Sequence, residues 1–234
     1  MLLKKQCLLG LEGSGFAVSA GLCKEGTPVS LAFTNSGIQT SEIILETIES
    51  LFSRSGVNKE DLRGICVSLG PGSFTSLRVS LATVEALALG LDIPVYGVDL
   101  LRLMAASSLY FDGTVKVIQK AYKGEMYYGC YRTRSGKVAE VKPIDLIDPK
   151  EFIEELEKGD LIMGTGLELI KSQQEEMREK GVLWREDFRT QVSGLDVIEY
   201  FLDQPEKPSQ GAPLEPIYIK LSEAEINFDK RAGR

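Results

Sequence analysis

The residues of this chain best suited to chemistry form one short turn, Gly70-Pro71-Gly72-Ser73-Phe74-Thr75. It lies between an apolar segment, 64–69, that predicts a buried strand, and a nearly all-apolar helix predicted over about 74–90. The two glycines permit a turn that a β-carbon would obstruct, and Ser73 can cap the helix. Free backbone N–H groups at such a helix start suit an anion such as phosphate. An ordinary tight turn explains the same residues, and the spacing is not that of a P-loop, because no Gly-Lys-Ser/Thr follows.

Other groups with catalytic potential are scarce. The chain has no histidine, which removes Ser-His and Cys-His nucleophile systems, histidine metal sites and the commonest general base. Its four cysteines form no C-x-x-C pair, which predicts buried free thiols. Glu12, at the end of the first predicted strand, is the acid best placed to face a cleft, and Asp99 ends the fifth. Two isolated acids do not define a metal site, so no catalytic residue and no metal ligand is predicted. The residues that could hold a phosphate or nucleotide are Gly70, Gly72, Ser73, Thr75, Arg78 and Glu12.

The predicted elements occur in the same order twice: three strands, a helix, a strand and a helix. Those of the first half are strands 6–12, 16–23 and 28–33, helix 40–52, strand 64–69, helix 74–90, strand 94–97 and helix 99–110. Those of the second half are strands 115–121, 125–133 and 137–143, a helix opened by Asp148 and Pro149, strand 160–164, helices near 167–179 and 193–202, and a strand at 216–221. Such a duplication predicts two tandem actin-like (ASKHA, RNase H-like) α/β subdomains, each a mixed sheet with flanking helices. The expected boundaries are 1–105 and 106–222, followed by a flexible tail at 223–234.

The predicted helix 74–90 is apolar around most of its girth, whereas helix 40–52 has a single apolar face, typical of core packing. One stripe of helix 74–90 consists of Leu77, Leu81, Val84 and Ala88, and another of Val79, Ala82, Ala86 and Leu89. A helix with two apolar stripes must be covered on more than one side. The cover is either the neighbouring helix or another polypeptide, and the pattern alone leaves both possibilities open.

The charge and the apolar runs of the chain indicate which partners and which compartment to expect. It has 27 basic and 34 acidic residues, a net charge of −7, which argues against direct, phosphate-led binding of nucleic acid by this chain alone. No signal peptide is predicted, because Gly10 and Glu12 break the apolar run after Lys4 and Lys5. No stretch is expected to approach the ~20 apolar residues of a membrane span. A cytoplasmic protein is therefore expected.

Residues 68–78, Ser-Leu-Gly-Pro-Gly-Ser-Phe-Thr-Ser-Leu-Arg, closely resemble the G-P-G-S-F-T-G-L-R signature of the TsaB/YeaZ family. Weaker matches lie at 41–42, 86–88, 94–98, 123–127 and 215–220, the last reading Glu-Pro-Ile-Tyr-Ile-Lys. The resemblance covers about the whole chain, with the signature as its specific part. Glu12 and Ser76 stand where the family has aspartate and glycine, and Lys120-Ala121-Tyr122 where it has Asp-Ala-Arg. These changes remove groups that would bind a nucleotide.

The resemblance implies a duplicated actin-like fold and a non-catalytic role. TsaB/YeaZ proteins act with a catalytic subunit, TsaD, in adding a threonylcarbamoyl group to adenosine beside the anticodon of tRNA, and they lack the metal-binding histidines of TsaD. It further implies that the first two long helices bind a TsaD-like subunit, or a second copy of the chain in a homodimer when that subunit is absent, and that a TsaE-like ATPase joins the complex. The chain would reach tRNA only through the complex and hold no cofactor of its own, and partners would hold ATP or ADP and a metal. The expected partner-binding residues are Ile44, Ile48, Leu51, Leu77, Leu81, Val84 and Ala88.

Three other functions are weighed against this one. An actin-like ATPase or phosphotransferase would bind nucleotide at the Gly70–Ser73 turn, but it needs a magnesium carboxylate set and phosphate loops in both halves. A self-associating protein without a TsaD link is the second alternative, and light scattering alone would not exclude it. A glycoprotease is disfavoured, because the chain offers no histidine and no plausible nucleophile site.

Overall fold

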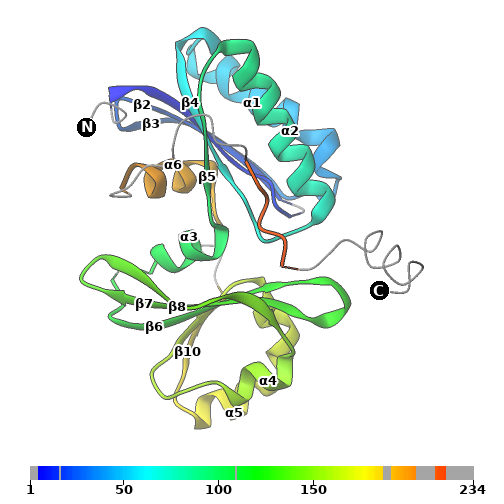
Figure 1. The fold of residues 1–234 in the computed structure, drawn as a ribbon, viewed down its shortest axis with the longest axis vertical. Coiled ribbons are helices and arrows are strands. Elements are labelled where there is room, and N and C mark those ends of the chain that lie inside the picture. The colour runs from blue at the N-terminus through cyan, green and yellow to red at the C-terminus, as the bar shows by residue number, and fades with distance from the viewer. Residues whose placement is uncertain (1–4, 16, 109, 187–190, 204–213, 220–234) are drawn as a thin grey trace.

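The computed structural model describes residues 5–15, 17–108, 110–186, 191–203 and 214–219. They form two α/β halves, each built on a five-stranded sheet, which lie one above the other in Figure 1. The elements of the first half are β1 (Cys7–Glu12), β2 (Val18–Lys24), β3 (Thr27–Thr34), α1 (Thr40–Ser55), a 3-10 turn (Lys59–Asp61), β4 (Leu62–Ser68), α2 (Phe74–Leu91), β5 (Val95–Val98) and α3 (Leu100–Ala106). Every predicted element of this half is confirmed, although α3 is shorter than expected.

The second half repeats the order with shorter helices. Its elements are β6 (Gly113–Lys120), a 3-10 turn (Tyr122–Gly124), β7 (Met126–Arg134), β8 (Lys137–Ile147), α4 (Pro149–Glu154), β9 (Leu161–Met163), a 3-10 segment (Thr165–Gln173), α5 (Gln174–Glu179), β10 (Leu183–Arg185) and α6 (Gly194–Asp203). Asp148 caps α4 by accepting a hydrogen bond from the Lys150 amide, as predicted. The helix expected near 167–179 is instead a 3-10 segment followed by α5, and β10 was not predicted.

The two sheets share one strand order, which confirms the duplicated fold. The first reads β3-β2-β1-β4-β5 and the second β8-β7-β6-β9-β10. In each half the first three strands pair antiparallel. The fourth strand pairs parallel with the free edge of the first strand, and the fifth pairs parallel with the fourth. This is the actin-like, RNase H-like arrangement. β1 is buried along its whole length, because α1 and α2 cover one face of the first sheet and α6 covers the other.

The last helix of each half packs on the sheet of the other half. Residues of α3 share a core cluster with β6 and β7, and residues of α6 share one with β1, β4 and β5. The predicted boundaries, 1–105 and 106–222, place α6 in the second subdomain, and they stay a prediction. The approach is close: a β-carbon on Gly10 would lie 1.8 Å from the Gly194 carbonyl oxygen. Glycine is therefore required here by the contact between β1 and α6.

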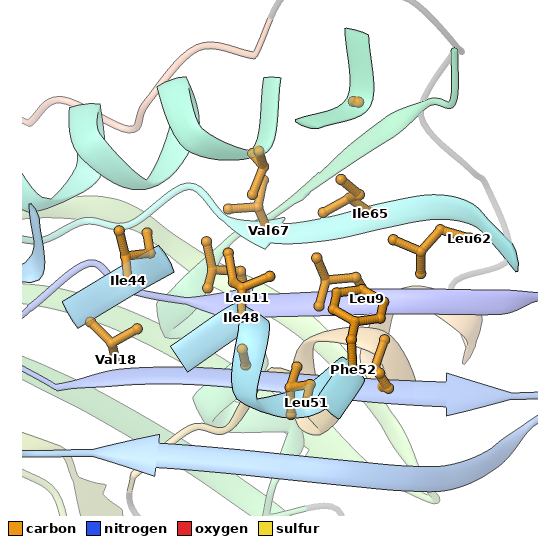
Figure 2. Packing of buried hydrophobic residues seen from close by; sticks show 14 of the residues in the cluster. Leu9, Leu11, Val18, Ile44, Ile48, Leu51, Phe52, Leu62, Ile65 and Val67 are labelled. Atoms are coloured by element: carbon orange, nitrogen blue, oxygen red, sulfur yellow. The ribbon is translucent and has the colours of Figure 1, made fainter. Parts of the chain in front are cut away.

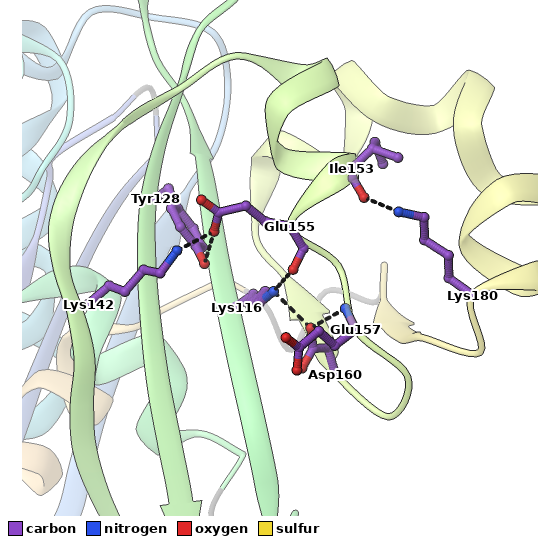
Figure 3. A network of polar contacts seen from close by, with 8 residues as sticks. All are labelled: Lys116, Tyr128, Lys142, Ile153, Glu155, Glu157, Asp160 and Lys180. Atoms are coloured by element: carbon purple, nitrogen blue, oxygen red, sulfur yellow. Dashed lines mark hydrogen bonds and ion pairs between the residues drawn. The ribbon is translucent and has the colours of Figure 1, made fainter.

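A buried polar network fastens the second sheet to the connection between α4 and β9 (Figure 3). The ammonium of Lys116 lies 2.9 Å from Asp160 Oδ2, with the side chains 7% and 5% exposed, and it also donates to the Glu155 carbonyl. The Glu155 carboxylate accepts hydrogen bonds from the Tyr128 hydroxyl and from Lys142, at 3.2 and 2.7 Å. Buried charges are tolerated when they are paired and hydrogen-bonded in this way. We assign the network a structural role.

Residues 214–219, here called the C-terminal strap, run beside α2 (Figure 1). A strand was expected at 216–221, but the strap has no strand assignment over its described residues. Among the residues that the structure describes, its one backbone hydrogen bond to another segment runs from the Ile217 amide to the Leu69 carbonyl, at 2.9 Å. A single such bond does not make a strand. The tail expected at 223–234 lies outside the described residues.

Candidate functional site

The seven residues predicted to bind a partner lie in the chain's own core. None is more than 5% exposed, and six of them belong to one cluster with β1, β2 and β4. Figure 2 shows Ile44, Ile48 and Leu51 of α1 directed at the strands of the first sheet. Side chains this deeply buried cannot contact another subunit, so their assignment to the partner surface was wrong. The physical reason is that the stripes with the largest apolar side chains pack against the chain's own sheet, because these side chains bury the most surface. The residues concerned are Ile44, Ile48, Leu51, Leu77, Leu81, Val84 and Ala88.

The exposed surface of α2 is its other, smaller stripe. Ala82, Ala86 and Gly90 are exposed at every fourth position, and Leu89 beside them is 85% exposed. On α1, which packs against α2, Leu45 is 62% exposed. Small side chains at helical spacing allow another helix to approach closely. We call Ala82, Ala86, Leu89 and Gly90 the α2 stripe.

The helix α2 is apolar on its outer side as well as on the side that packs on the first sheet. By length and composition it could cross a membrane, and only 33% of its 18 residues are buried. Length and composition alone are weak evidence for a membrane span. Single helices of soluble proteins pass the same test, and α2 packs one face on the first sheet like a core helix. What distinguishes it is the exposed α2 stripe, in which Leu89 is 85% exposed.

The Gly-rich turn is occupied by the chain itself. Gly70 has φ +87°, a conformation that favours glycine. A β-carbon on Gly72 would lie 2.2 Å from the Ser14 carbonyl oxygen, and the Ser73 amide donates to that same oxygen at 2.7 Å. The Ser73 hydroxyl accepts from the Ser76 amide at 3.4 Å, which confirms the predicted cap. The loop after β1 therefore uses groups of the turn that a phosphate would need.

Glu12 lies beside this loop and is 9% exposed. Its Oε1 accepts from the amide and hydroxyl of Ser14, at 3.0 and 2.5 Å, and its buried Oε2 has no hydrogen-bond partner among the described residues. Burial raises the pKa of the Glu12 carboxyl, although hydrogen bonds from Ser14 and Ser68 act in the opposite direction. A buried carboxyl with a raised pKa takes up a proton more readily than a free one, which makes it a less favourable ligand for Mg²⁺.

The remaining residues of the predicted nucleotide set are Thr75 and Arg78, which lie on the exposed side of the first turns of α2. Glu12, Gly72 and Ser73 are thus brought together through Ser14, whereas Arg78 contacts the C-terminal strap through Tyr218. In the second half, a β-carbon on Gly164 would lie 2.1 Å from the Ile118 carbonyl oxygen, so that turn is packed as well. Over the described ranges, no three His, Cys, Asp or Glu side chains lie close enough to hold a metal ion.

Sequence reasoning missed two residues of this region, Ser14 and Tyr218. Ser14 follows an acid by two residues, a spacing at which a hydroxyl can bond a nearby carboxylate. Tyr218 belongs to the Glu-Pro-Ile-Tyr-Ile-Lys segment, but nothing in that segment indicates that it lies against α2. A surface hollow at the other end of β1 is lined by Lys5, Gln6, Cys7, Lys24, Glu25, Asp61 and Arg63, and by none of the predicted site residues.

Comparison with known proteins identifies relatives of this chain. A family model described as TsaD, tRNA N6-adenosine threonylcarbamoyltransferase, matches residues 36–178, more than half of the chain. The tRNA threonylcarbamoyladenosine biosynthesis protein TsaB of Bacillus subtilis (strain 168) is 28% identical over 225 residues, covering 94% of this chain and 97% of the relative. TsaB of Escherichia coli (strain K12) is 29% identical over 127 residues, covering 53% of this chain and 54% of the relative. The solved structure of YeaZ from Pseudomonas aeruginosa superposes with a TM-score of 0.72 at 22% identity, covering 91% of this chain and 99% of that chain.

Proposed function

The chain belongs to the TsaB/YeaZ family of tRNA threonylcarbamoyladenosine biosynthesis proteins, and from that premise we propose that it is the non-catalytic partner of a TsaD-like subunit. In this proposal the chain binds and activates a catalytic subunit that transfers the threonylcarbamoyl group to tRNA adenosine in the cytoplasm. Binding occurs through the α2 stripe, with Leu45 of α1 at its side. The same face would pair two copies of the chain when the TsaD-like subunit is absent.

One observation carries the proposal: α2 leaves a stripe of apolar residues exposed, with Ala82, Ala86 and Gly90 at helical spacing and Leu89 85% exposed beside them. Fully burying a leucine side chain contributes about 1.5–3 kcal/mol, and Leu89 is 85% exposed in the isolated chain. Ala82, Ala86 and Gly90 would let a partner helix approach closely enough to bury it. A protein partner therefore gains apolar contact area without any rearrangement of the first sheet.

The assignment of the chemistry to the partner rests on the composition of this chain and on its turn. The chain has no histidine, and its Gly-rich turn is bonded to Ser14. We propose that ATP or ADP and any metal of the complex are held by the other subunits. The alternative, an actin-like phosphotransferase, is tested by calorimetry of Mg-ATP binding to the isolated chain. A micromolar dissociation constant would favour the alternative.

The test of the proposal is Ala82→Asp, measured as affinity for the TsaD-like protein of the same cell. A carboxylate desolvated in an apolar contact should weaken binding at least about tenfold. Ala139→Asp, at an exposed alanine of β8 on the other half, is the matched control and should bind like the wild type. Equal affinities of Ala82→Asp and wild type would show that the α2 stripe is not the docking surface.

A further inference from the structure

The C-terminal strap is fixed to α2 at several points. The Ile217 amide donates to the Leu69 carbonyl at 2.9 Å, directly before the Gly-rich turn. Leu214 packs against the core cluster to which α2 contributes. The strap therefore follows the flank of α2 from the core cluster to the turn that begins the helix (Figure 1). The proposed function leaves this segment without a role.

The strap ends in a cluster of two aromatic rings and an arginine. The rings of Phe74 and Tyr218 lie 5.1 Å apart between centroids, and the Arg78 guanidinium carbon lies 3.9 Å from the centroid of Phe74. Arg78 Nε–H donates to the Tyr218 hydroxyl at 3.2 Å. These contacts hold the guanidinium in one place, so fewer conformations are lost when it binds something else.

Arg78 lies on the same side of α2 as the α2 stripe, one turn before Ala82, and is exposed. Tyr218 is 43% exposed beside it. Within the described part of the chain, no carboxylate forms an ion pair with Arg78. Arginine and tyrosine are the residue types that most often dominate the energy of an interface, and an ordered guanidinium can bind a carboxylate through two parallel hydrogen bonds.

We propose that the C-terminal strap is part of the docking surface, and that it holds Arg78 in position to bind a carboxylate of the TsaD-like subunit. The inference rests on the proposed function and extends it: the partner surface should present an acidic side chain beside an apolar helix. Tyr218 acts as a positioning residue, since it orders Arg78 without needing to touch the partner group. Because the net charge of the chain is −7, its surface as a whole does not attract an acidic partner. An ordered cation such as Arg78 would therefore direct an acidic side chain of the partner to one place.

The experiment measures affinity for the TsaD-like protein at two salt concentrations, using the full chain. Arg78→Ala and Tyr218→Ala should each weaken binding about tenfold, the scale of one interface hot spot. The double variant should be little weaker than Arg78→Ala alone, because the two side chains act as one unit. Both single variants should show a flatter salt dependence than wild type, since each removes or disorders the same ion pair. Tyr218→Phe keeps the ring contact with Phe74 and should lose part of the affinity.

Two exposed residues of the other half provide controls, Tyr110→Ala and Arg178→Ala, and both should bind like wild type with unchanged salt dependence. Thermal unfolding of each variant shows whether a loss of affinity arises from loss of structure, and Tyr218→Phe provides the folded comparison. If Ala82→Asp abolishes binding while Arg78→Ala and Tyr218→Ala stay within twofold of wild type, the proposed function stands and the role of the strap is refuted. If Ala82→Asp has no effect, the α2 stripe is not the docking surface, and this inference fails with that assignment.

Discussion

Replacement of Gly72 by alanine should destabilise the chain by about 2–4 kcal/mol. The added β-carbon would lie 2.2 Å from the Ser14 carbonyl oxygen and 2.9 Å from Ser14 Cβ, so the loop after β1 must move by about 1 Å to reach ordinary contact. Overpacking of this kind costs about 1–3 kcal/mol. The movement also breaks the 2.7 Å hydrogen bond from the Ser73 amide to Ser14, a loss of about 1 kcal/mol.

The matched control is Gly90→Ala, at a helical glycine of α2 where an added β-carbon meets nothing within 4 Å. Alanine is favoured over glycine in a helix by about 0.5–1 kcal/mol, so this variant should be slightly stabilised. Chemical denaturation followed by circular dichroism measures both free energies of unfolding, and the two variants should change in opposite directions. Surface substitutions usually change the free energy of unfolding by no more than about 0.5 kcal/mol. If the free energy of unfolding of Gly72→Ala lies within that range of wild type, the turn does not pack against Ser14 as described.

Three further tests address the core, the electrostatics and the second half. Val84→Glu places a carboxylate where the wild-type side chain is 0% exposed. It should therefore abolish the cooperative thermal unfolding of the first half, and not merely weaken partner binding. A normal unfolding transition would contradict the assignment of Val84 to the core. Burial raises the pKa of Asp99 from 3.8 to about 6, so folding favours its protonated form, and the unfolding free energy should fall as pH rises through that window. Asp99→Asn, which can still cap α3, should remove part of this fall in denaturation curves, and an unchanged slope would refute the shift. Lys116→Met leaves Asp160 buried without its cation and should lower the free energy of unfolding by about 3–5 kcal/mol. Adding Asp160→Leu to the same chain should restore much of that loss. If the two substitutions instead lower the free energy of unfolding additively, the two side chains do not act as a pair.

The duplicated fold could be predicted because the strands of both halves are apolar runs bounded by turn residues, and the order of elements is itself informative. β10 could not, since Leu183, Trp184 and Arg185 form a run of three residues, too short for any periodicity. The position of α6 depends on Gly10 and Gly194 approaching each other from distant parts of the chain, and no local pattern reports such a contact. The Gly-rich turn was located correctly, but its occupation by Ser14 is a tertiary fact of the same kind.

The error about the partner surface has a physical cause that applies to other helices with two apolar stripes. On α2, Leu77, Leu81 and Val84 are buried, whereas Ala82 and Ala86 are exposed. Larger side chains gain more from burial, so the chain's own sheet, which must be covered for the chain to fold at all, takes the larger stripe. A stripe of small residues gives little stabilisation within the monomer, but it permits the short interaxial distance that a second helix needs. Side-chain size would therefore have distinguished the two stripes from the sequence, with the small one assigned to the partner. The same reasoning predicts that Ala82→Leu, which adds apolar area to the α2 stripe, should weaken partner binding by preventing close approach while leaving the free energy of unfolding nearly unchanged. Stronger binding by that variant would show that contact area, and not close approach, governs the interface.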